Sequence, residues 1–297
     1  VYQDNPGLQP TPGKALNLSI DSELQALIED LFRGKKGAAI CMMPQSGEVL
    51  AFVSAPDYDL NSFAGPVPIE LWERWNTDPE RPLLNRGIQG LYPPGSTFKL
   101  IGAALAKEES IVDKNWTVNC NGVYHLGDRD FHCWNNAGHG IVNMDKAIFQ
   151  SCNIYFYHLI QKLSFNNWKA MAENFGFGAT TGIDLLGEKG GLVPGKKYMN
   201  KKYGRYGWAT GNLLTFIIGQ GDILVTPIQV AQMMSIIATR GNTKTPHLLV
   251  DSPSENIIVS LKSTTWDFLQ QATWNVVNHE DGTGKAAKVL GGEVHGK

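Results

Sequence analysis

The chain has 297 residues, of which 42% are hydrophobic and 18% charged, which suits one large globular domain or two closely packed subdomains. Its formal net charge of −2 provides no overall basic field, so nucleic acid is not an expected partner. The sequence contains neither a signal peptide nor a run of roughly eighteen apolar residues, and composition alone leaves the cellular compartment open.

The beginning of the chain predicts a helix packed on antiparallel strands. Residues 1–15 are typical of a linker, because Pro and Gly recur among polar residues. Residues 16–20 predict a short strand, and Asp21 can cap a helix whose apolar positions recur at helical spacing up to Phe32. Residues 37–43 and 49–54 predict two strands joined by a turn.

Helical patterns dominate the middle of the sequence, after a loop-like stretch at 56–90. The predicted helices cover 98–107, most of 143–178 with a break near Ser151, the segment from Thr226-Pro227 to before Gly241, and 265–278. Beyond Gly282 the pattern becomes extended again. Strands at both ends with helices between them predict an α/β fold, with a sheet built from both termini and a helical insertion.

The segment 92–99 carries the strongest chemical signal. Pro93, Pro94 and Gly95 interrupt the chain immediately before an apolar helix, which places Ser96 at or near the helix N-terminus, where backbone N–H groups favour developing negative charge. Lys99 lies on the same helical face, and an apolar environment that lowers its pKa would make it a base for the Ser96 hydroxyl. Taken alone, Ser-x-x-Lys is better explained by a capping serine and a solvated lysine, because this spacing is common by chance.

Two further elements follow in order along the chain. Ser151 and Asn153 interrupt a helical stretch, so both side chains can face a cleft, where Ser151 would relay a proton and Asn153 would hold a substrate amide. Lys297 ends an extended segment. Ser-x-x-Lys, Ser-x-Asn and a later Lys are the ordered triplet of serine β-lactamases and penicillin-binding proteins.

With these motifs the sequence resembles the class B penicillin-binding proteins, most of all the penicillin-binding protein 2 group, which are cell-elongation peptidoglycan D,D-transpeptidases. The likeness spans most of 14–297 and rests on the segments 85–99, 219–221, 225–231, 47–51 and 281–284. It implies the serine β-lactamase/penicillin-binding transpeptidase fold, an antiparallel sheet flanked by helices plus an all-helical subdomain. It also implies a linker at 1–15 and a transpeptidase domain at 16–297 that stops at the Lys of the third motif, so that the C-terminal strands would follow Lys297.

The resemblance implies a serine acyl-enzyme chemistry. Ser96 would attack the bond between the two terminal D-alanines of a peptidoglycan stem peptide, with Lys99 as base, Ser151 and Lys297 moving the proton, and Asn153 positioning the amide. β-Lactam antibiotics would acylate the same serine. The expected partner is a membrane glycan polymerase of the elongation machinery, and the expected location is the periplasmic face of the inner membrane, reached through an N-terminal anchor.

Two other functions of the same fold remain open at this point. A serine β-lactamase or D,D-carboxypeptidase would hydrolyse the acyl-enzyme, but the sequence offers no identifiable base for the deacylating water. A β-lactam-sensing domain would be acylated once and would signal, but no attached signalling segment is visible in the sequence.

Cys120, Cys133, His139 and Cys152 form a sequence-local set of metal ligands, separated by 13, 6 and 13 positions. Three thiolates and one imidazole suffice for a tetrahedral structural Zn²⁺, and Cys152 is the middle residue of Ser-x-Asn, so the metal would brace that motif. The alternative is a Cys120–Cys133 disulfide, suited to an oxidising periplasm, with Cys152 in the core. His125 or His132 could replace His139. Cys41, in an apolar run, is predicted to be a buried hydrophobic residue.

Overall fold

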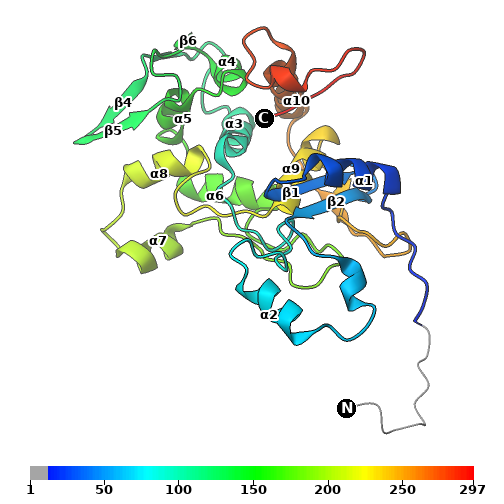
Figure 1. The fold of residues 1–297 in the computed structure, drawn as a ribbon. Helices are drawn as coiled ribbons and strands as arrows, with labels where there is room; N and C mark the ends of the chain where they lie inside the picture. Colours follow the sequence, from blue (N-terminus) through cyan, green and yellow to red (C-terminus); the bar gives the residue numbers. More distant parts are fainter. Residues whose placement is uncertain (1–12) are drawn as a thin grey trace, which may run out of the picture.

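The structure, a computed structural model, describes residues 13–297 (Figure 1). Most of the predicted linker at 1–15 therefore lies outside the described residues, and its end, residues 13–15, is exposed. Within the described part of the chain, no helix combines the length and the apolarity that a membrane crossing requires.

A small antiparallel sheet forms one part of the molecule. Strand β1 (Gly37–Met42) pairs with β2 (Val49–Ala55), with an irregularity in register between Cys41 and Met42. Helix α1 (Ser22–Leu31) contacts β2, and the Asp21 carboxylate caps it by accepting two backbone N–H bonds of 3.0 Å. Helix α9 (Pro227–Ala238) contacts β1 (Figure 1). The predicted hairpin and both helices are thus present.

A helical part is built around α3 (Lys99–Glu108), whose eight residues from Lys99 to Ala106 are all buried. This burial is possible because small alanines and branched aliphatic residues cover nearly every side of the helix. The helices around α3 are α4 (Met144–Phe149), α5 (Asn153–Ile160), α6 (Phe165–Asn174), α8 (Thr210–Ile217) and α10 (Ser263–Asn278). The main hydrophobic core lies between them.

Two short antiparallel pairs lie beside α5 and were not predicted from the sequence. They join β3 (Val118–Cys120) to β6 (Gly140–Val142), and β4 (Val123–Leu126) to β5 (Arg129–His132). The remaining elements are η1 (Leu60–Phe63), α2 (Ile69–Thr77), η2 (Gly95–Phe98), α7 (Lys196–Tyr203), β7 (Asn242–Lys244), β8 (Asn256–Ile258) and η3 (Lys285–Ala287).

Three predicted elements differ from the structure. Residues 16–20 form no strand, because only Leu18 makes a bridge, to Leu249. The loop predicted at 56–90 contains η1 and α2. The extended segment predicted beyond Gly282 is wrong as a strand, and within the described residues the sheet of β1 and β2 has two strands. The backbone N–H groups of Thr283, Gly284 and Gly296 bond to carbonyls of α4 and α10 rather than to a strand.

Candidate active site and metal centre

Ser96 lies on the 3-10 turn η2, one turn before α3 begins. Phe98 anchors this turn in the core. Its ring is fully buried, and its centroid lies 5.6 Å from that of Trp168 and 5.0 Å from that of Phe177. A second contact fixes the turn, because the Gly95 backbone N–H donates to the Gly219 carbonyl at 2.9 Å. The Ser96 hydroxyl, in contrast, is half-buried and borders a cavity.

Lys99 is the first residue of α3 and has no exposed surface. Its ammonium donates to the Ser151 carbonyl at 2.7 Å, to Ser151 Oγ at 3.1 Å and to Asn153 Oδ1 at 2.7 Å, so three acceptors match its three donors. Burial lowers the pKa of Lys99 to about 8, because removal from water disfavours the charged form. Near neutral pH this lysine can therefore reach the neutral state that a base requires.

Ser151 occupies the sharp junction between α4 and α5. Its φ of 55° is left-handed, and its N–H bonds to the Ile148 carbonyl while that of Cys152 bonds to Ala147. This pair of bonds is a Schellman motif, in which glycine usually takes the left-handed position. A serine there costs backbone strain on the order of 1 kcal/mol. The sharp turn leaves the Ser151 carbonyl and hydroxyl facing Lys99, and it starts α5 at Asn153.

Hydrogen bonds connect Ser96 to Lys99 through Ser151. The Oγ atoms of Ser151 and Ser96 are 2.9 Å apart, and Ser151 Oγ is 3.1 Å from Lys99 Nζ. Each hydroxyl can donate in either direction, since its proton rotates. When Lys99 is neutral, the chain can therefore run Ser96 O–H to Ser151 to Lys99. The sequence predicted direct proton transfer from Ser96 to Lys99. The structure places the Ser151 hydroxyl between them, so the proton would pass through one additional hydroxyl.

A cavity of about 570 Å³ lies beside Ser96 and Ser151, and Lys297 is also among the residues that line it. Lys297 Nζ donates to the Ile148 carbonyl at 2.5 Å, and burial together with the charge of Lys99 lowers the pKa of Lys297 to about 6. The described residues that line the cavity are Ser96, Trp134, Ser151, Asn153, Ile218, Gln220, Thr283 and Lys297. All five residues predicted as catalytic lie in or directly beside this cavity, and no carboxylate is among its described lining residues.

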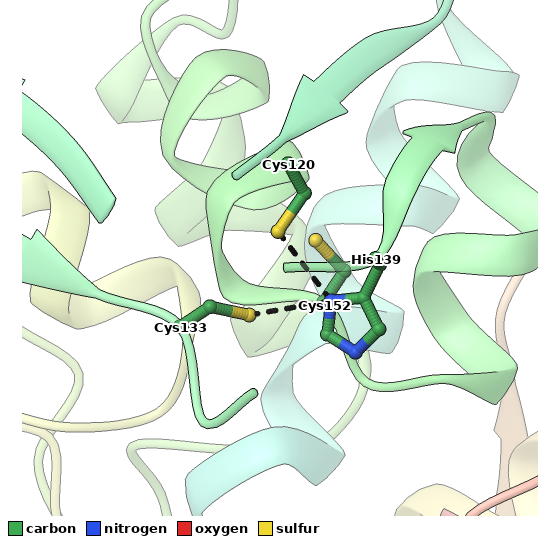
Figure 2. Close-up of side chains that lie close together, drawn as sticks. All are labelled: Cys120, Cys133, His139 and Cys152. Carbon is green, nitrogen blue, oxygen red and sulfur yellow. Dashed lines mark hydrogen bonds between the residues drawn. The ribbon is translucent and has the colours of Figure 1, made fainter. Parts of the chain in front are cut away.

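The four predicted metal ligands also converge (Figure 2). The ligand atoms of Cys120, Cys133, His139 and Cys152 all lie within 4.8 Å of one another. His139 Nδ1 is 3.4 Å from Cys120 Sγ and 3.5 Å from Cys133 Sγ. A tetrahedral zinc with ordinary Zn–S and Zn–N bonds separates such ligand atoms by roughly 3.5–3.8 Å. The donor set and its spacing therefore fit a structural zinc ion.

The competing assignments fit the structure less well. All four cysteines are free thiols, including Cys120 and Cys133, and Cys41 is half-buried rather than fully buried. The His125 ring, on the exposed β4–β5 hairpin, pairs with Asp130 at 2.6 Å. The metal-ligand group contains His139 and not His132. The hydrogen bond between Cys133 and Cys152 lowers the pKa of the Cys133 thiol and raises that of the Cys152 thiol, so the two thiols share one proton more readily than they lose both.

The candidate metal centre touches the active site through backbone and ring contacts. The Asn153 backbone N–H donates to Cys133 Sγ at 3.4 Å, and Cys152 lies between Ser151 and Asn153 in sequence. The Trp134 ring meets the His139 ring edge-on at 5.4 Å. A metal bound at these residues would therefore fix the junction that carries Ser151 and Asn153.

Residues 37–297 match the family model described as the penicillin binding protein transpeptidase domain. The chain belongs to the penicillin-binding protein transpeptidase family. Membership confirms the family resemblance and the fold class predicted from the sequence, including an antiparallel sheet flanked by helices.

Individual relatives place the chain near the penicillin-binding protein 2 group of this family. It is 35% identical over 288 residues to the peptidoglycan D,D-transpeptidase MrdA of Haemophilus influenzae, covering 93% of this chain and 44% of the relative. The chain thus spans less than half the length of that relative. The solved structure of Pseudomonas aeruginosa penicillin-binding protein 2 with WCK 5153 superposes with a TM-score of 0.85 at 36% identity, covering 94% of this chain and 66% of the other.

A chain from a solved peptidoglycan synthase complex that coordinates polymerization and crosslinking is also similar. It has a TM-score of 0.79 and 30% identity, with coverage of 94% of this chain and 51% of that chain.

Four residues that line the cavity of this transpeptidase family member were not predicted as site residues: Trp134, Ile218, Gln220 and Thr283. Gln220 and Thr283 lie within sequence motifs that carried the family resemblance, which was the available signal. Trp134 is 59% exposed, and its Nε1 donates to the Gln150 carbonyl at 2.9 Å. A tryptophan between two metal-binding residues carries no sequence signal for a cavity wall.

Proposed function

We propose that this chain is the catalytic domain of a peptidoglycan D,D-transpeptidase that cross-links stem peptides through an acyl-enzyme on Ser96. The observation that carries the proposal is the pair of hydrogen bonds that connects the Ser96 hydroxyl through the Ser151 hydroxyl to the Lys99 amine. This lysine is buried, and its pKa is lowered. A cell-elongation role, and with it a role in cell shape, follows from the similarity to the penicillin-binding protein 2 group.

The proposed reaction begins when Ser96 Oγ attacks the carbonyl carbon of the penultimate D-alanine. The hydroxyl proton passes through Ser151 to Lys99, and the backbone N–H groups at the start of the helix stabilise the developing oxyanion. The bond to the terminal D-alanine then breaks, and its nitrogen takes back the proton as it leaves. The Asn153 side chain, held by Lys99 at 2.7 Å, positions the peptide amide.

In the second half, an amine of a neighbouring stem peptide attacks the ester on Ser96. The amine gives up a proton through the same hydroxyls, a new peptide bond forms, and the Ser96 hydroxyl is regenerated. Lys297, largely neutral at pH 7 because its pKa is lowered, is a further group that moves protons at the cavity. A β-lactam acylates Ser96 by the same first step, and the opened ring remains attached to the enzyme.

Acyl transfer is proposed over hydrolysis from the similarity to peptidoglycan D,D-transpeptidases, and the described lining residues of the cavity offer no carboxylate as a base for a deacylating water. A β-lactamase needs a base that activates the deacylating water. The side chains that border Ser96 can receive its proton and return it, but they provide no separate acidic residue for water.

Labelling with a fluorescent penicillin tests this function. The purified protein should form a stable covalent adduct, and the Ser96→Ala variant should form none. Rapid loss of the label from the wild-type protein would instead indicate a β-lactamase. Absence of labelling in correctly folded protein would contradict the acyl-enzyme.

We also infer that Cys120, Cys133, His139 and Cys152 hold a structural Zn²⁺ in this enzyme. The fit rests on the donor set and on its convergence within 4.8 Å. When bound, the metal would link β3, the β5–β6 loop and the α4–α5 junction to one another. Its role would be structural, and it would take no part in the acyl transfer. The protein groups that benefit are Ser151 and Asn153, whose junction the ligand Cys152 occupies.

The partners and location follow from the same proposal. Stem peptides ending in D-Ala-D-Ala are the substrates, and β-lactam antibiotics are the inhibitors. A membrane glycan polymerase is the proposed protein partner, supported by the similarity to a chain of a synthase complex for polymerization and crosslinking. Such an assembly works at the periplasmic face of the inner membrane, where peptidoglycan strands are joined.

A further inference from the structure

Positive charge is concentrated on α7 and the loop that follows it. The chain as a whole has 28 acidic and 26 basic side chains, but residues 196–205 include five cations and no acid. These cations are Lys196, Lys197, Lys201, Lys202 and Arg205, and all of them are exposed. We call this set the α7 basic surface. Such local concentration on a slightly acidic protein produces a positive field that composition does not reveal.

The helix is anchored so that its cations face solvent. Met199 is fully buried and fixes α7 on the core. Asp222 pairs with Lys202 at 2.5 Å and accepts from the Tyr203 hydroxyl at 2.7 Å, which ties the end of the helix to the loop after α8. Lys202 is thereby partly neutralised. Within the described chain, no acidic side chain pairs with the other four cations, so they remain available to an external anion.

Aromatic rings accompany these charges. The Lys202 ammonium lies 5.0 Å from the centre of the Tyr203 ring, and Arg205 lies 5.7 Å from that of Tyr206, which is 90% exposed. Cations beside aromatic faces suit a ligand that combines carboxylates with flat apolar ring faces, as sugars do. They do not suit insertion into a bilayer, because the apolar residue of α7, Met199, faces the core.

One loop and one short helix connect the α7 basic surface to residues that line the cavity. A six-residue loop, 204–209, leads from α7 into α8 (Figure 1). Ile218 and Gln220, which follow α8, line the cavity beside Ser96. Eight helical residues extend about 12 Å. A polymer that places one peptide in the cavity extends beyond this length, so its neighbouring part is a candidate to contact α7.

We propose that the α7 basic surface is a second binding site for the peptidoglycan strand whose stem peptide reacts at Ser96. The carboxylates of the strand bind Lys196, Lys197, Lys201 and Arg205, and its sugar rings pack on the tyrosines. This inference rests on the proposed function and adds a substrate contact outside the reacting bond. It predicts an interaction that salt weakens, because the groups are exposed and charged.

The test measures binding of soluble, sonicated peptidoglycan strands to the purified protein at low and at moderate salt. The variant replaces three cations that form no pair: Lys196→Gln, Lys197→Gln and Lys201→Gln. The matched control removes the same charge elsewhere, at the exposed residues Lys14→Gln, Lys35→Gln and Lys288→Gln. At low salt the α7 variant should bind at least about tenfold more weakly than wild type, with a shallower salt dependence, whereas the control variant should bind like wild type.

Two parallel measurements separate the possible failures. Fluorescent penicillin labelling of Ser96 should be the same in all three proteins, and failure of the wild type to label would contradict the proposed function rather than the second site. Undiminished peptidoglycan binding by the α7 variant, or an equal loss in the control variant, would overturn the second site. So would an α7 variant that keeps its peptidoglycan binding but no longer binds vesicles containing phosphatidylglycerol, since the surface would then serve a membrane.

Discussion

The Ser151 hydroxyl lies between the Ser96 hydroxyl, at 2.9 Å, and the Lys99 ammonium, at 3.1 Å. The same lysine also holds the Ser151 carbonyl at 2.7 Å. One residue thus links nucleophile and base, and its backbone is fixed by that base. The left-handed φ of 55° at Ser151 makes this geometry possible, because the chain turns sharply enough there to present both groups to Lys99.

Replacing Ser151 separates its chemical role from its backbone role. Ser151→Ala and Ser151→Gly both remove the hydroxyl, so acylation of Ser96 by a penicillin should slow by roughly a hundredfold in each, the scale of a lost proton-transfer group. Glycine adopts the left-handed backbone without strain, whereas alanine adopts it only at a cost in free energy. The free energy of unfolding should therefore be higher for Ser151→Gly than for Ser151→Ala by about 1 kcal/mol. Stopped-flow acylation and denaturant unfolding measure the two effects, and equal acylation by wild type and both variants would refute the relay.

The pH dependence of acylation should report Lys99. Its pKa is lowered to about 8 by burial, so the neutral amine that accepts a proton increases as pH rises through that value. The acylation rate should therefore rise with pH, with an inflection near 8, and level off above it. The variant Lys99→Arg, which cannot lose its proton in this range, should be almost inactive without such an inflection. A flat profile from pH 6 to 10 in the wild type would exclude Lys99 as the base.

The stability of the protein should change in the same direction with pH. A buried lysine whose folded pKa is below its unfolded value of 10.5 makes the unfolded state bind more protons between about pH 8 and 10.5. The contribution of Lys99 thus disfavours folding below pH 8 and fades as pH rises toward 10.5. Denaturant unfolding of the wild type and of Lys99→Met should show that the advantage of the methionine variant shrinks over this range. An advantage that stays constant would contradict the assignment.

Local sequence chemistry predicted the parts of this site that depend on neighbouring residues. The Pro-Pro-Gly break before an apolar helix placed Ser96 and Lys99, and the polar interruption at Ser151 placed the α4–α5 junction. The connection of these parts could not be derived from spacing, since the contact between Lys99 and Ser151 spans 52 residues and depends on how α3 packs against α4 and α5. The residues after Gly282 have the pattern of a strand, and the sequence therefore predicted one. The pattern does not reveal which groups the backbone bonds to, and these are carbonyls of α4 and α10.

Removal of the metal should loosen the Ser151–Asn153 junction. We expect about one zinc per chain in protein purified without chelator. Cys133→Ala should lose it, because the variant removes both a ligand and the sulfur that accepts the Asn153 N–H at 3.4 Å. The melting temperature and the rate of penicillin acylation should then both fall. Cys41→Ala is the matched control, since this thiol lies outside the cluster, and it should retain zinc. The zinc assignment would be refuted if wild-type protein purified without chelator contained no metal, were fully folded and were acylated by penicillin.

Gly219 should be required for the position of the nucleophile. Its carbonyl accepts the Gly95 N–H at 2.9 Å, its φ is 71°, and a Cβ atom at this residue would lie 2.1 Å from the Gly95 carbonyl oxygen. Because that oxygen belongs to the backbone immediately before Ser96, Gly219→Ala must displace η2. Displacement of a reacting group by about 1 Å can cost roughly a hundredfold in rate.

The control for this prediction is Gly204→Ala. Its φ of 79° is similarly left-handed, but a Cβ there meets no atom within 4 Å. It should lose only about 1 kcal/mol of stability from backbone strain and should keep its acylation rate. Gly219→Ala should lose more stability and most of its acylation, because it combines the same strain with a collision against the turn that carries Ser96. If the two variants acylate at the same rate, the close approach of Gly219 to Gly95 has no part in positioning the serine.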